Sequence, residues 1–457
     1  MMSLAEAARS LNVKRVGADV HFNSVSTDSR RFEHGALFVA LRGERFDGHD
    51  FIGPVAAAGA AAAMVDGRYA GDAGPLPMLV VEDTRVSLGR LAAAWRSRFD
   101  IPLIAVAGSN GKTTVKEMIA AILREHFGES QVLATEGNFN NDIGLPLTLL
   151  RLREGHRAAV VEIGMNHPGE TAMLAAMARP TIALVNNAQR EHQEFMKSVA
   201  DVAAEHAALP ASLPREGVAV INADDEHAVI WRDAAARAGA TVTDFGVEGQ
   251  AAVRGHVVPG RFSSSIDVST AQGSARIELP VPGLHNVRNA LAAIAASMAA
   301  GASLASAARA LQVFSAVKGR MQRKQTNNGA VLIDDSYNAN PESVHAAIDV
   351  LAACPEPRIL VLGDMGEVGE HGPAFHAEVG EHARSACLTN LLALGELTRH
   401  ALASFGAGLH VDSVEELVEA LRAYDRTGAT LLVKGSRFMR MERVVDALSG
   451  AAAGGAH

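Results

Sequence analysis

Short runs of apolar residues, each ending in a turn and followed by a segment with helical spacing, recur through the middle of the chain. Four such runs lie at residues 103–107, 158–163, 181–185 and 218–221. Apolar runs of this length between turn signals are typical of strands buried on both faces, and their alternation with helices indicates a parallel sheet. We therefore predict an α/β domain that begins after the proline-marked boundary at residues 100–102.

Two further patterns follow in the second half of the chain. Residues 253–281 alternate apolar with polar positions, which predicts antiparallel strands, and a helical segment comes after them. Beyond Phe314, new apolar runs separated by helical patterns lie at residues 331–333, 359–362, 391–394 and 431–433. Their regular alternation predicts a doubly wound, Rossmann-like sheet, whose ligands bind beyond the carboxyl ends of the strands.

The 457 residues are too many for one hydrophobic core and suggest about three domains. We place them at residues 1–99, 100–314 and 315–457. The expected fold is therefore α/β throughout: a small α/β domain, a central α/β domain with an added antiparallel sheet, and the doubly wound domain. The alanine-rich stretch 290–314 predicts two packed helices broken at Gly301, since its polar residues would be costly in a membrane. Residues 451–457 are expected to form a frayed tail.

The charge balance narrows the possible partners. A formal net charge of -9 with a pI near 6.1 provides no basic surface for a nucleic-acid backbone or an anionic membrane. No N-terminal segment has the apolar core of a secretory signal. The two cysteines, Cys354 and Cys387, lack the spacing of a zinc site or a disulfide framework. We expect a cytoplasmic monomer with no nucleic-acid partner and no membrane insertion.

The strongest local signal is AVAGSNGKTTVKEMIAAIL, in which an apolar strand leads into a glycine loop and then a helix. A phosphate-binding loop requires this context, because backbone N–H groups and a helix N-terminus together attract phosphate oxygens. We predict ATP binding here, with Lys112 at the terminal phosphates and the Thr113 hydroxyl on Mg²⁺. The loop comprises Gly108, Ser109, Asn110, Gly111, Lys112, Thr113 and Thr114. Its G-x-x-G-K-T spacing is shorter than that of the ordinary Walker loop, and the alternative is a glycine turn with a solvated lysine.

Two polar residues follow neighbouring strands of the same predicted sheet. Glu162 lies at the end of one apolar run, and His192 lies in the loop after the next. Because the carboxyl ends of parallel strands share one edge of a sheet, we expect Glu162 to reach the metal held by Thr113, and His192 to contact metal or phosphate. The alternatives are a structural salt bridge for Glu162 and a solvated loop histidine. With Lys112, these two residues form the predicted catalytic set.

These residues and several longer motifs resemble a known family. AGSNGKTT, the glutamate of VVEIG and the following NN...EH are similar to the ATP site of the Mur ligases. TEGNFNNDIGLPLTLL, PGLHNVRNALAA, DDSYNANPES, LGDMGEVGE and LVKGSRFMRMERVV are similar to motifs of the members that add D-alanyl-D-alanine. The resemblance covers nearly the whole chain. It implies an ATP- and Mg²⁺-dependent ligase that joins UDP-N-acetylmuramoyl-tripeptide to D-alanyl-D-alanine through an acyl phosphate.

The resemblance also implies where the ligands bind. In STDSRRFEHGALFVALRGERFDGHDF, the first domain would hold the UDP-sugar through Ser26, Thr27, Asp28, Ser29, Arg30, Gly43, Asp47 and His49. The peptide would face Asn138, Asn140, Asn141 and Asp142, and the adenine would lie near Asn286 and Asn289. From the third domain, Arg320 and Asp335 would contact the nucleotide, and the dipeptide would meet Tyr337, Asn338, Asn340, Lys434, Ser436 and Arg437.

Simpler explanations stay open for several of these assignments. Aspartate, serine and glycine favour turns, which would account for the polar residues of the first domain. Asn286 has the residue type of a helix N-cap. The basic residues after the run at 431–433 fit solvated charges at the start of a helix.

One position departs from the family pattern. Mur ligases usually carry a carbamylated lysine a short way after the histidine that corresponds to His192, where it helps to hold a second magnesium. The segment SVADVAAEHAALPASLP contains no lysine, and Lys197 lies too early. Glu205 and His206 lie in the matching neighbourhood, so we expect Glu205 to supply the carboxylate instead.

Other functions remain open on the sequence alone. One rival is a different ligase of the same superfamily, such as the enzyme that adds the third peptide residue or one that polyglutamates folate. Another is a phosphate-loop switch without ligation chemistry. The motif DDSYNANPES favours the dipeptide-adding enzyme.

Overall fold

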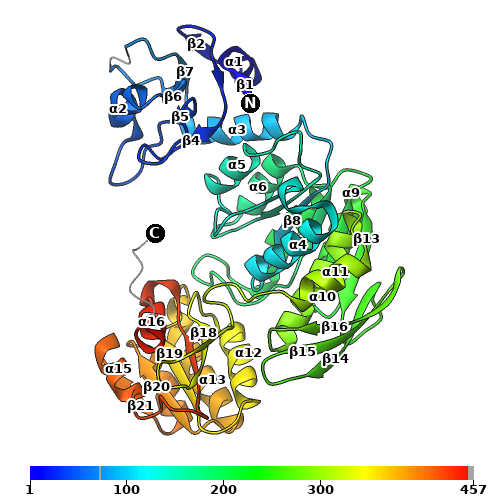
Figure 1. Ribbon diagram of the computed structural model, residues 1–457, viewed down its shortest axis with the longest axis vertical. Helices are drawn as coiled ribbons and strands as arrows, with labels where there is room; N and C mark the ends of the chain where they lie inside the picture. The colour runs from blue at the N-terminus through cyan, green and yellow to red at the C-terminus, as the bar shows by residue number, and fades with distance from the viewer. Residues whose placement is uncertain (72–73, 451–457) are drawn as a thin grey trace.

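The computed structural model describes residues 1–71 and 74–450, and the expected frayed tail at residues 451–457 lies outside them. Three bodies follow one another along an open arc, each built around its own main sheet (Figure 1). These sheets span residues 14–81, 103–279 and 322–434. The predicted α/β class is confirmed, while the domain limits at residues 99 and 314 stay predictions.

The first body contains a five-stranded sheet in the order β2-β7-β6-β5-β4, parallel except for β2. Its strands are β2 (Lys14–Val16), β4 (Val25–Ser26), β5 (Leu37–Val39), β6 (Ala62–Asp66) and β7 (Met78–Val81), and β1 (Met2–Ser3) and β3 (His21–Phe22) form a separate pair. Its helices are α1 (Leu4–Leu11), η1 (Gly48–Phe51), α2 (Ile52–Ala57) and α3 (Thr84–Arg96). The Trp95 indole on α3 donates to the carbonyl oxygen of Leu152 at 3.1 Å. One apolar core therefore continues from the first body into the central one.

The central body is a nine-stranded sheet in the order β16-β15-β14-β13-β12-β11-β8-β10-β9. Its strands are β8 (Leu103–Ala107), β9 (Val132–Ala134), β10 (Ala158–Glu162), β11 (Ile182–Val185), β12 (Val218–Asn222), β13 (Thr241–Gly246), β14 (Val253–Pro259), β15 (Ser264–Thr270) and β16 (Gly273–Leu279). All pairs are parallel except the two that join β14, β15 and β16, so the predicted strands and the antiparallel extension are confirmed. Two strands were not predicted: β9, which is very short, and β13, whose first residues are exposed.

Helices cover both faces of the central sheet. One face packs against α4 (Lys112–Phe127), α10 (Leu284–Ala299) and α11 (Leu304–Gln312). The other packs against α5 (Gly144–Leu149), α6 (Glu170–Ala178), α7 (Val199–His206), α8 (Ala208–Ala211) and α9 (Ala228–Ala238), and η2 (Glu129–Gln131) follows α4. The predicted break between α10 and α11 at Gly301 is confirmed, since this residue has a φ of +96°. Across residues 1–71 and 74–450, no helix has the length and apolarity needed to cross a bilayer.

The third body has a six-stranded sheet in the order β17-β18-β22-β19-β20-β21, in which only β17 is antiparallel. Its strands are β17 (Gln322–Gln325), β18 (Val331–Asp335), β19 (Arg358–Gly363), β20 (Asn390–Leu394), β21 (Leu409–Val411) and β22 (Thr430–Lys434). One face packs against α12 (Pro341–Ala352), α13 (Gly372–Ser385) and α14 (Thr398–Phe405), the other against α15 (Val414–Leu421) and α16 (Glu442–Ser449). Two short turns, η3 (Gly369–His371) and η4 (Arg437–Met439), complete it. The doubly wound prediction is confirmed.

Candidate active site

The predicted phosphate loop connects β8 to α4. Gly108 and Gly111 have φ angles of +136° and +84°, where most side chains are strained. A Cβ atom on Gly111 would clash with the side-chain oxygen of Asn289, so glycine is required there. Because α4 begins at Lys112, the partial positive charge of its N-terminus lies at the loop.

Two buried asparagines of α10 lie beneath the loop. Asn186 Nδ2 donates to Asn289 Oδ1 at 2.9 Å and to the carbonyl oxygen of Asn110 at 2.9 Å, which ties the loop to this helix. The N-cap of α10 is Gly283, and the Asn286 amide donates to the carbonyl oxygen of Pro282 at 2.8 Å. The N-cap alternative for Asn286 is therefore wrong.

A cavity of about 1030 Å³ lies between the central and third bodies, and its lining brings most of the predicted residues together. From the central body these are Ser109, Asn110, Gly111, Lys112, Thr113, Thr114, Asn138, Asn140, Asn141, Asp142, Glu162, His192, Asn286 and Asn289. From the third body they are Arg320, Asp335, Tyr337, Asn338, Asn340, Lys434, Ser436 and Arg437. Gly108 belongs to the same loop, at the end of β8. The individual roles of these residues stay predictions.

Glu162 lies at the end of β10, paired in register with Val106 of β8, and is 2% exposed. Its Oε1 accepts a hydrogen bond from Asn140 Nδ2 at 2.7 Å. Among the residues that the structure describes, its buried Oε2 has no hydrogen-bond partner and no basic side chain pairs with it, so the salt-bridge alternative is not what the structure shows. A buried polar atom without a partner costs about 1–3 kcal/mol, which points to a ligand at Oε2.

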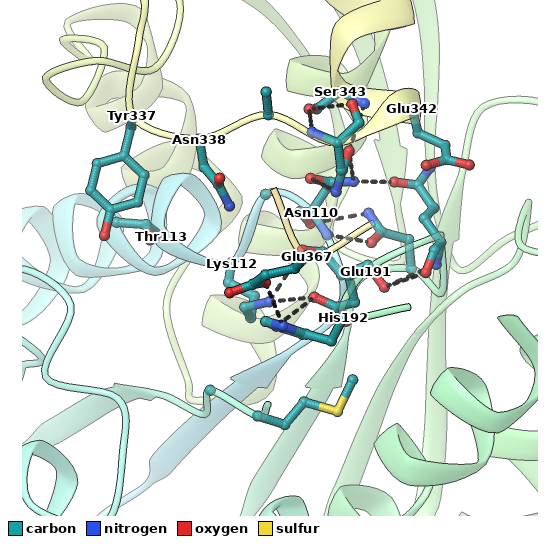
Figure 2. Close-up of a pocket in the computed structure, with 18 of the residues that line it drawn as sticks. Asn110, Lys112, Thr113, Glu191, His192, Tyr337, Asn338, Glu342, Ser343 and Glu367 are labelled. Carbon is teal, nitrogen blue, oxygen red and sulfur yellow. Dashed lines mark hydrogen bonds and ion pairs between the residues drawn. The ribbon is translucent and has the colours of Figure 1, made fainter. Parts of the chain in front are cut away.

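A second carboxylate, Glu191, faces the loop from the β11 side. Its Oε2 lies 3.3 Å from Lys112 Nζ and 3.9 Å from His192 Nε2, and its Oε1 lies 3.1 Å from His206 Nε2. Figure 2 shows Lys112, Glu191, His192 and Glu367 gathered at one point of the cavity. Burial opposes ionisation of Glu191, but the Lys112 ammonium and the hydrogen bond from His206 outweigh it and lower the pKa to about 2.

Glu191 lines the cavity but is not among the predicted site residues, whereas the predicted Glu205 faces away from the cavity. Both oxygens of Glu205 accept backbone N–H groups at the start of α6, from Gly169 and Thr171, at 2.9 Å each. The expectation that Glu205 supplies a metal-binding carboxylate is therefore wrong. The available signal for Glu191 was its position beside His192, after a strand of the nucleotide-binding sheet.

The segment from Asn138 to Asp142 forms the wall next to the first body. Asp142 pairs with Arg85 of α3, with Nη2 to Oδ1 at 2.7 Å. Asn141 Oδ1 accepts the N–H of Gly144 at 2.8 Å, at the start of α5. These contacts fix the segment that brings Asn140 to Glu162.

On the opposite wall, the ends of β18 and β22 carry an ion pair. Lys434 Nζ lies 2.6 Å from Asp335 Oδ2 and donates to the carbonyl oxygen of Asn338 at 2.9 Å. Lys434 is buried, so the solvated-charge alternative fails for this residue. The Tyr337 ring has the guanidinium carbons of Arg320 and Arg437 at 4.2 and 5.8 Å from its centroid.

Several contacts join the central body to the third body across the cavity. Asn110 and Asn340 exchange amide hydrogen bonds of 3.1 and 3.2 Å, so the phosphate loop meets the N-cap of α12. Arg190 donates through both terminal nitrogens to Glu378 at 2.8 Å, and also to Glu342. The Glu378 carboxylate holds the pKa of the Arg190 guanidinium above its usual value.

His192 also makes one of these contacts. Its Nδ1 lies 2.7 Å from Glu367 Oε2, and the histidine lowers the pKa of that carboxyl. The alternative of a solvated histidine therefore does not apply to His192, whose side chain is 15% exposed.

The predicted residues of the first body lie outside this cavity and bond mainly to one another. The Ser26 hydroxyl accepts the Asp28 N–H at 3.1 Å, and Asp28 accepts from Arg30, so the turn alternative describes this part of the loop. Asp47 Oδ1 accepts the His49 N–H at 3.0 Å. The others lie in the same loops: Thr27, Ser29 and Gly43.

Comparison with known proteins gives a consistent result. The chain matches the Mur ligase middle domain over residues 106–297, the Mur ligase glutamate ligase domain over 319–437 and the Mur ligase family catalytic domain over 21–96. It is 40% identical over 456 residues, 98% of each chain, to the UDP-N-acetylmuramoyl-tripeptide–D-alanyl-D-alanine ligase of Escherichia coli (strain K12).

Solved structures agree with the sequence relatives. A crystal structure of MurF from Acinetobacter baumannii superposes with a TM-score of 0.88 at 32% identity, covering 96% of this chain and 97% of that one. The MurF ligase of Thermotoga maritima in complex with ADP gives 0.82 at 26% identity, covering 93% and 96%. The chain therefore belongs to the Mur ligase family and is an ATP-dependent ligase that forms a carbon–nitrogen bond.

Proposed function

We propose that this ligase joins D-alanyl-D-alanine to the terminal carboxylate of UDP-N-acetylmuramoyl-tripeptide. ATP is converted to ADP and phosphate, and the product is the pentapeptide precursor of peptidoglycan. The observation that carries the proposal is a cavity in which the phosphate loop faces the polar ends of β18 and β22. The E. coli relative, which matches the chain over its full length, is named for this reaction.

Mg²⁺ is part of this proposal. Glu162 Oε2 is buried and without a hydrogen-bond donor in the described part of the chain, and Thr113 stands at the N-terminus of α4. No three His, Cys, Asp or Glu side chains within residues 1–71 and 74–450 form a ready metal cluster. Magnesium suits such a sparse donor set, because it keeps several waters and takes phosphate oxygens as ligands. When bound, the ion neutralises charge on the transferring phosphoryl group.

The chemistry needs positioning more than a reactive side chain. A free carboxylate resists attack by an amine, because it is negatively charged and has a poor leaving group. Transfer of the γ-phosphoryl group of ATP gives an acyl phosphate, the dipeptide's amine attacks its carbonyl carbon, and phosphate leaves. Lys112 and the loop N–H groups offset the phosphate charge. Closer approach of the two bodies would exclude water, which would otherwise hydrolyse the acyl phosphate.

The other subsites follow from the same proposal. The first body would hold the UDP portion through the loops that contain residues 26–30 and 43–49, with the peptide running along residues 138–142. The adenine would lie near Asn286 and Asn289, and the dipeptide between Tyr337 and the loop that begins at Lys434. We propose that the enzyme acts as a monomer in the cytoplasm.

A phosphate-release assay tests the proposal. Purified enzyme with ATP and Mg²⁺ should release phosphate only when the UDP-tripeptide and D-alanyl-D-alanine are both present, and the pentapeptide should be detected by mass. Turnover with the UDP-dipeptide and a single diamino acid would instead identify a ligase for the third residue. Glutamate-dependent turnover with a folate would identify a polyglutamating enzyme, and hydrolysis without any acceptor would support a phosphate-loop switch.

A further inference from the structure

Glu191 is poorly placed for a purely structural role. Its side chain is 7% exposed, and it lies in the phosphate-binding cavity, where the ligands are anionic. Lys112, its nearest cation, already donates to the carbonyl oxygens of Gly108 and Ser109. Taking an ion pair out of water gains little stability and often none, so folding alone gives little reason for a carboxylate at this position.

The arrival of nucleotide makes the position of Glu191 more unfavourable. Lys112 is the side chain expected to contact the terminal phosphates, and Glu191 Oε2 lies 3.3 Å from its ammonium. Phosphate oxygens bound at Lys112 would therefore come close to a carboxylate in a site of low dielectric, where like charges repel strongly. A cation between them converts this repulsion into attraction.

The order of the central strands places two carboxylates on opposite sides of the phosphate loop. The loop follows β8, which lies between β10 and β11 in the sheet. Glu162 is the last residue of β10, and Glu191 lies in the segment that follows β11. Glu162 independently presents a buried Oε2 with no partner among the described residues. The loop is thus flanked by oxygen ligands of the type that divalent cations prefer.

We propose that Glu191 is a ligand of a divalent cation that binds together with the nucleotide phosphates, and that His206 is its positioning residue. The proposal rests on the proposed function, because it assumes that nucleotide and Mg²⁺ bind in this cavity. His206 is 1% exposed and holds Glu191 Oε1 at 3.1 Å, which leaves Oε2 directed towards Lys112. Such second partners orient the carboxylates that bind metals.

Mn²⁺ binding provides a test that does not depend on turnover. The affinity for Mn²⁺ would be measured by electron paramagnetic resonance with a saturating non-hydrolysable ATP analogue. We expect Glu191→Gln to weaken Mn²⁺ binding about tenfold or more, the size seen when groups around a metal are removed. Glu205→Gln is the matched control, because that carboxylate only caps α6, and its Mn²⁺ affinity should equal that of the wild type.

Binding of the analogue in the presence of EDTA separates a metal role from damage to the fold. Removing a negative charge beside Lys112 should leave metal-free nucleotide binding unchanged or tighter in Glu191→Gln. Weaker Mn²⁺ binding together with unchanged or tighter binding of the metal-free nucleotide would support the proposal. Wild-type Mn²⁺ affinity in Glu191→Gln would overturn it, as would a parallel loss of both affinities.

Variants of His206 test the positioning role. His206→Leu should weaken Mn²⁺ binding several-fold without removing a ligand, and His206→Gln, which retains an N–H donor, should restore most of it. Equal Mn²⁺ affinities in both variants and the wild type would overturn the role of His206. If the wild-type enzyme bound the analogue but bound no Mn²⁺ with it, the magnesium part of the proposed function would fail together with this inference. If the wild type bound Mn²⁺ with the analogue and Glu191→Gln bound it equally well, this inference would fail while the proposed function would stand.

Discussion

Two regions of the molecule contain the same types of polar residue but differ in how completely these are hydrogen-bonded. One is the cavity between the central and third bodies, and the other is the polar cluster of the first body, formed by Arg42, His49, Asp66 and Arg68. In the first body, Asp66 accepts from Arg42 at 2.7 Å and from Arg68 at 3.0 Å, and its own N–H donates to His49 Nε2 at 3.0 Å. In the cavity, Glu162 keeps an oxygen that no donor among the described residues reaches. Polar groups that satisfy one another stabilise a fold, whereas a buried carboxylate oxygen without a partner in the lining of a cavity is available to a ligand.

The largest effect is expected from Lys112→Ala. Loss of the ammonium should lower phosphate release about 10²–10³-fold, the range seen when one group that stabilises transition-state charge is removed. The fold should remain, because the loop is also held by the Asn186 amide, which donates to the carbonyl oxygen of Asn110 and to Asn289 Oδ1. Turnover assays and thermal melts by circular dichroism check both parts. Near-normal turnover would contradict a catalytic role for Lys112 and show that the cavity's lysine is structural.

Glu162→Gln should raise the Mg²⁺ concentration needed for half-maximal turnover, on the order of 10–100-fold. Glutamine can still accept from Asn140, so the change removes mainly the charge at Oε2. Glu170→Gln is the control, because this cavity carboxylate already contacts the Asn166 N–H and the His167 ring. In magnesium titrations, the concentration for half-maximal turnover should rise only in Glu162→Gln. Equal rises in both variants would show a general effect of cavity charge.

Asp66→Asn in the first body should show the reverse pattern, with lost stability and nearly unchanged turnover per folded molecule. We expect a loss of about 2 kcal/mol in the free energy of unfolding, typical of a broken buried charged hydrogen-bond network. Urea denaturation at neutral pH measures it. A drop in turnover without a drop in stability would assign a catalytic role to this cluster.

The ionisation of Asp66 also makes the stability of the fold depend on pH. The hydrogen bond from Arg42 holds the pKa of Asp66 far below its usual range. A lowered pKa stabilises the fold fully above the unfolded value of about 3.9, and this stability is lost as the pH falls from there towards the folded pKa. The wild type should therefore lose more stability than Asp66→Asn between pH 6 and pH 3, and equal losses would contradict the assignment.

The sequence was sufficient for the features that depend on local pattern. Buried parallel strands give continuous apolar runs, so β8, β10, β11 and β12 could be placed, and the glycines of the phosphate loop follow from its turn. The short strands of the first body, such as β4 (Val25–Ser26), carry too few residues for a pattern to appear.

That Glu191 lines the cavity while Glu205 faces away from it depends on the direction of two side chains in three dimensions, which spacing along the chain does not determine. Glu205 lies on α7, and the packing of that helix against α6 turns its carboxylate to the N–H groups of Gly169 and Thr171. His206, the next residue, is directed towards Glu191 instead. Spacing along the chain identifies the neighbourhood of a ligand, whereas the helix rotation decides which side chain reaches the site.

The smallest predicted effect concerns ion pairs that join the central body to the third body across the cavity. They resemble the ion pairs of the first body, which form within that body. Arg190 contacts Glu342 and Glu378, and its guanidinium carbon lies 4.8 Å from the centroid of the Phe375 ring. Because these groups are partly exposed, Arg190→Ala should cost about 1 kcal/mol or less, seen as a rise of up to about fivefold in the KM for the dipeptide with little change in kcat. Arg190→Lys should recover only part of it, since lysine lacks the two-pronged geometry of arginine. Raising ionic strength should weaken dipeptide binding in the wild type more than in Arg190→Ala; parallel salt curves would mean that the two bodies close without this contact.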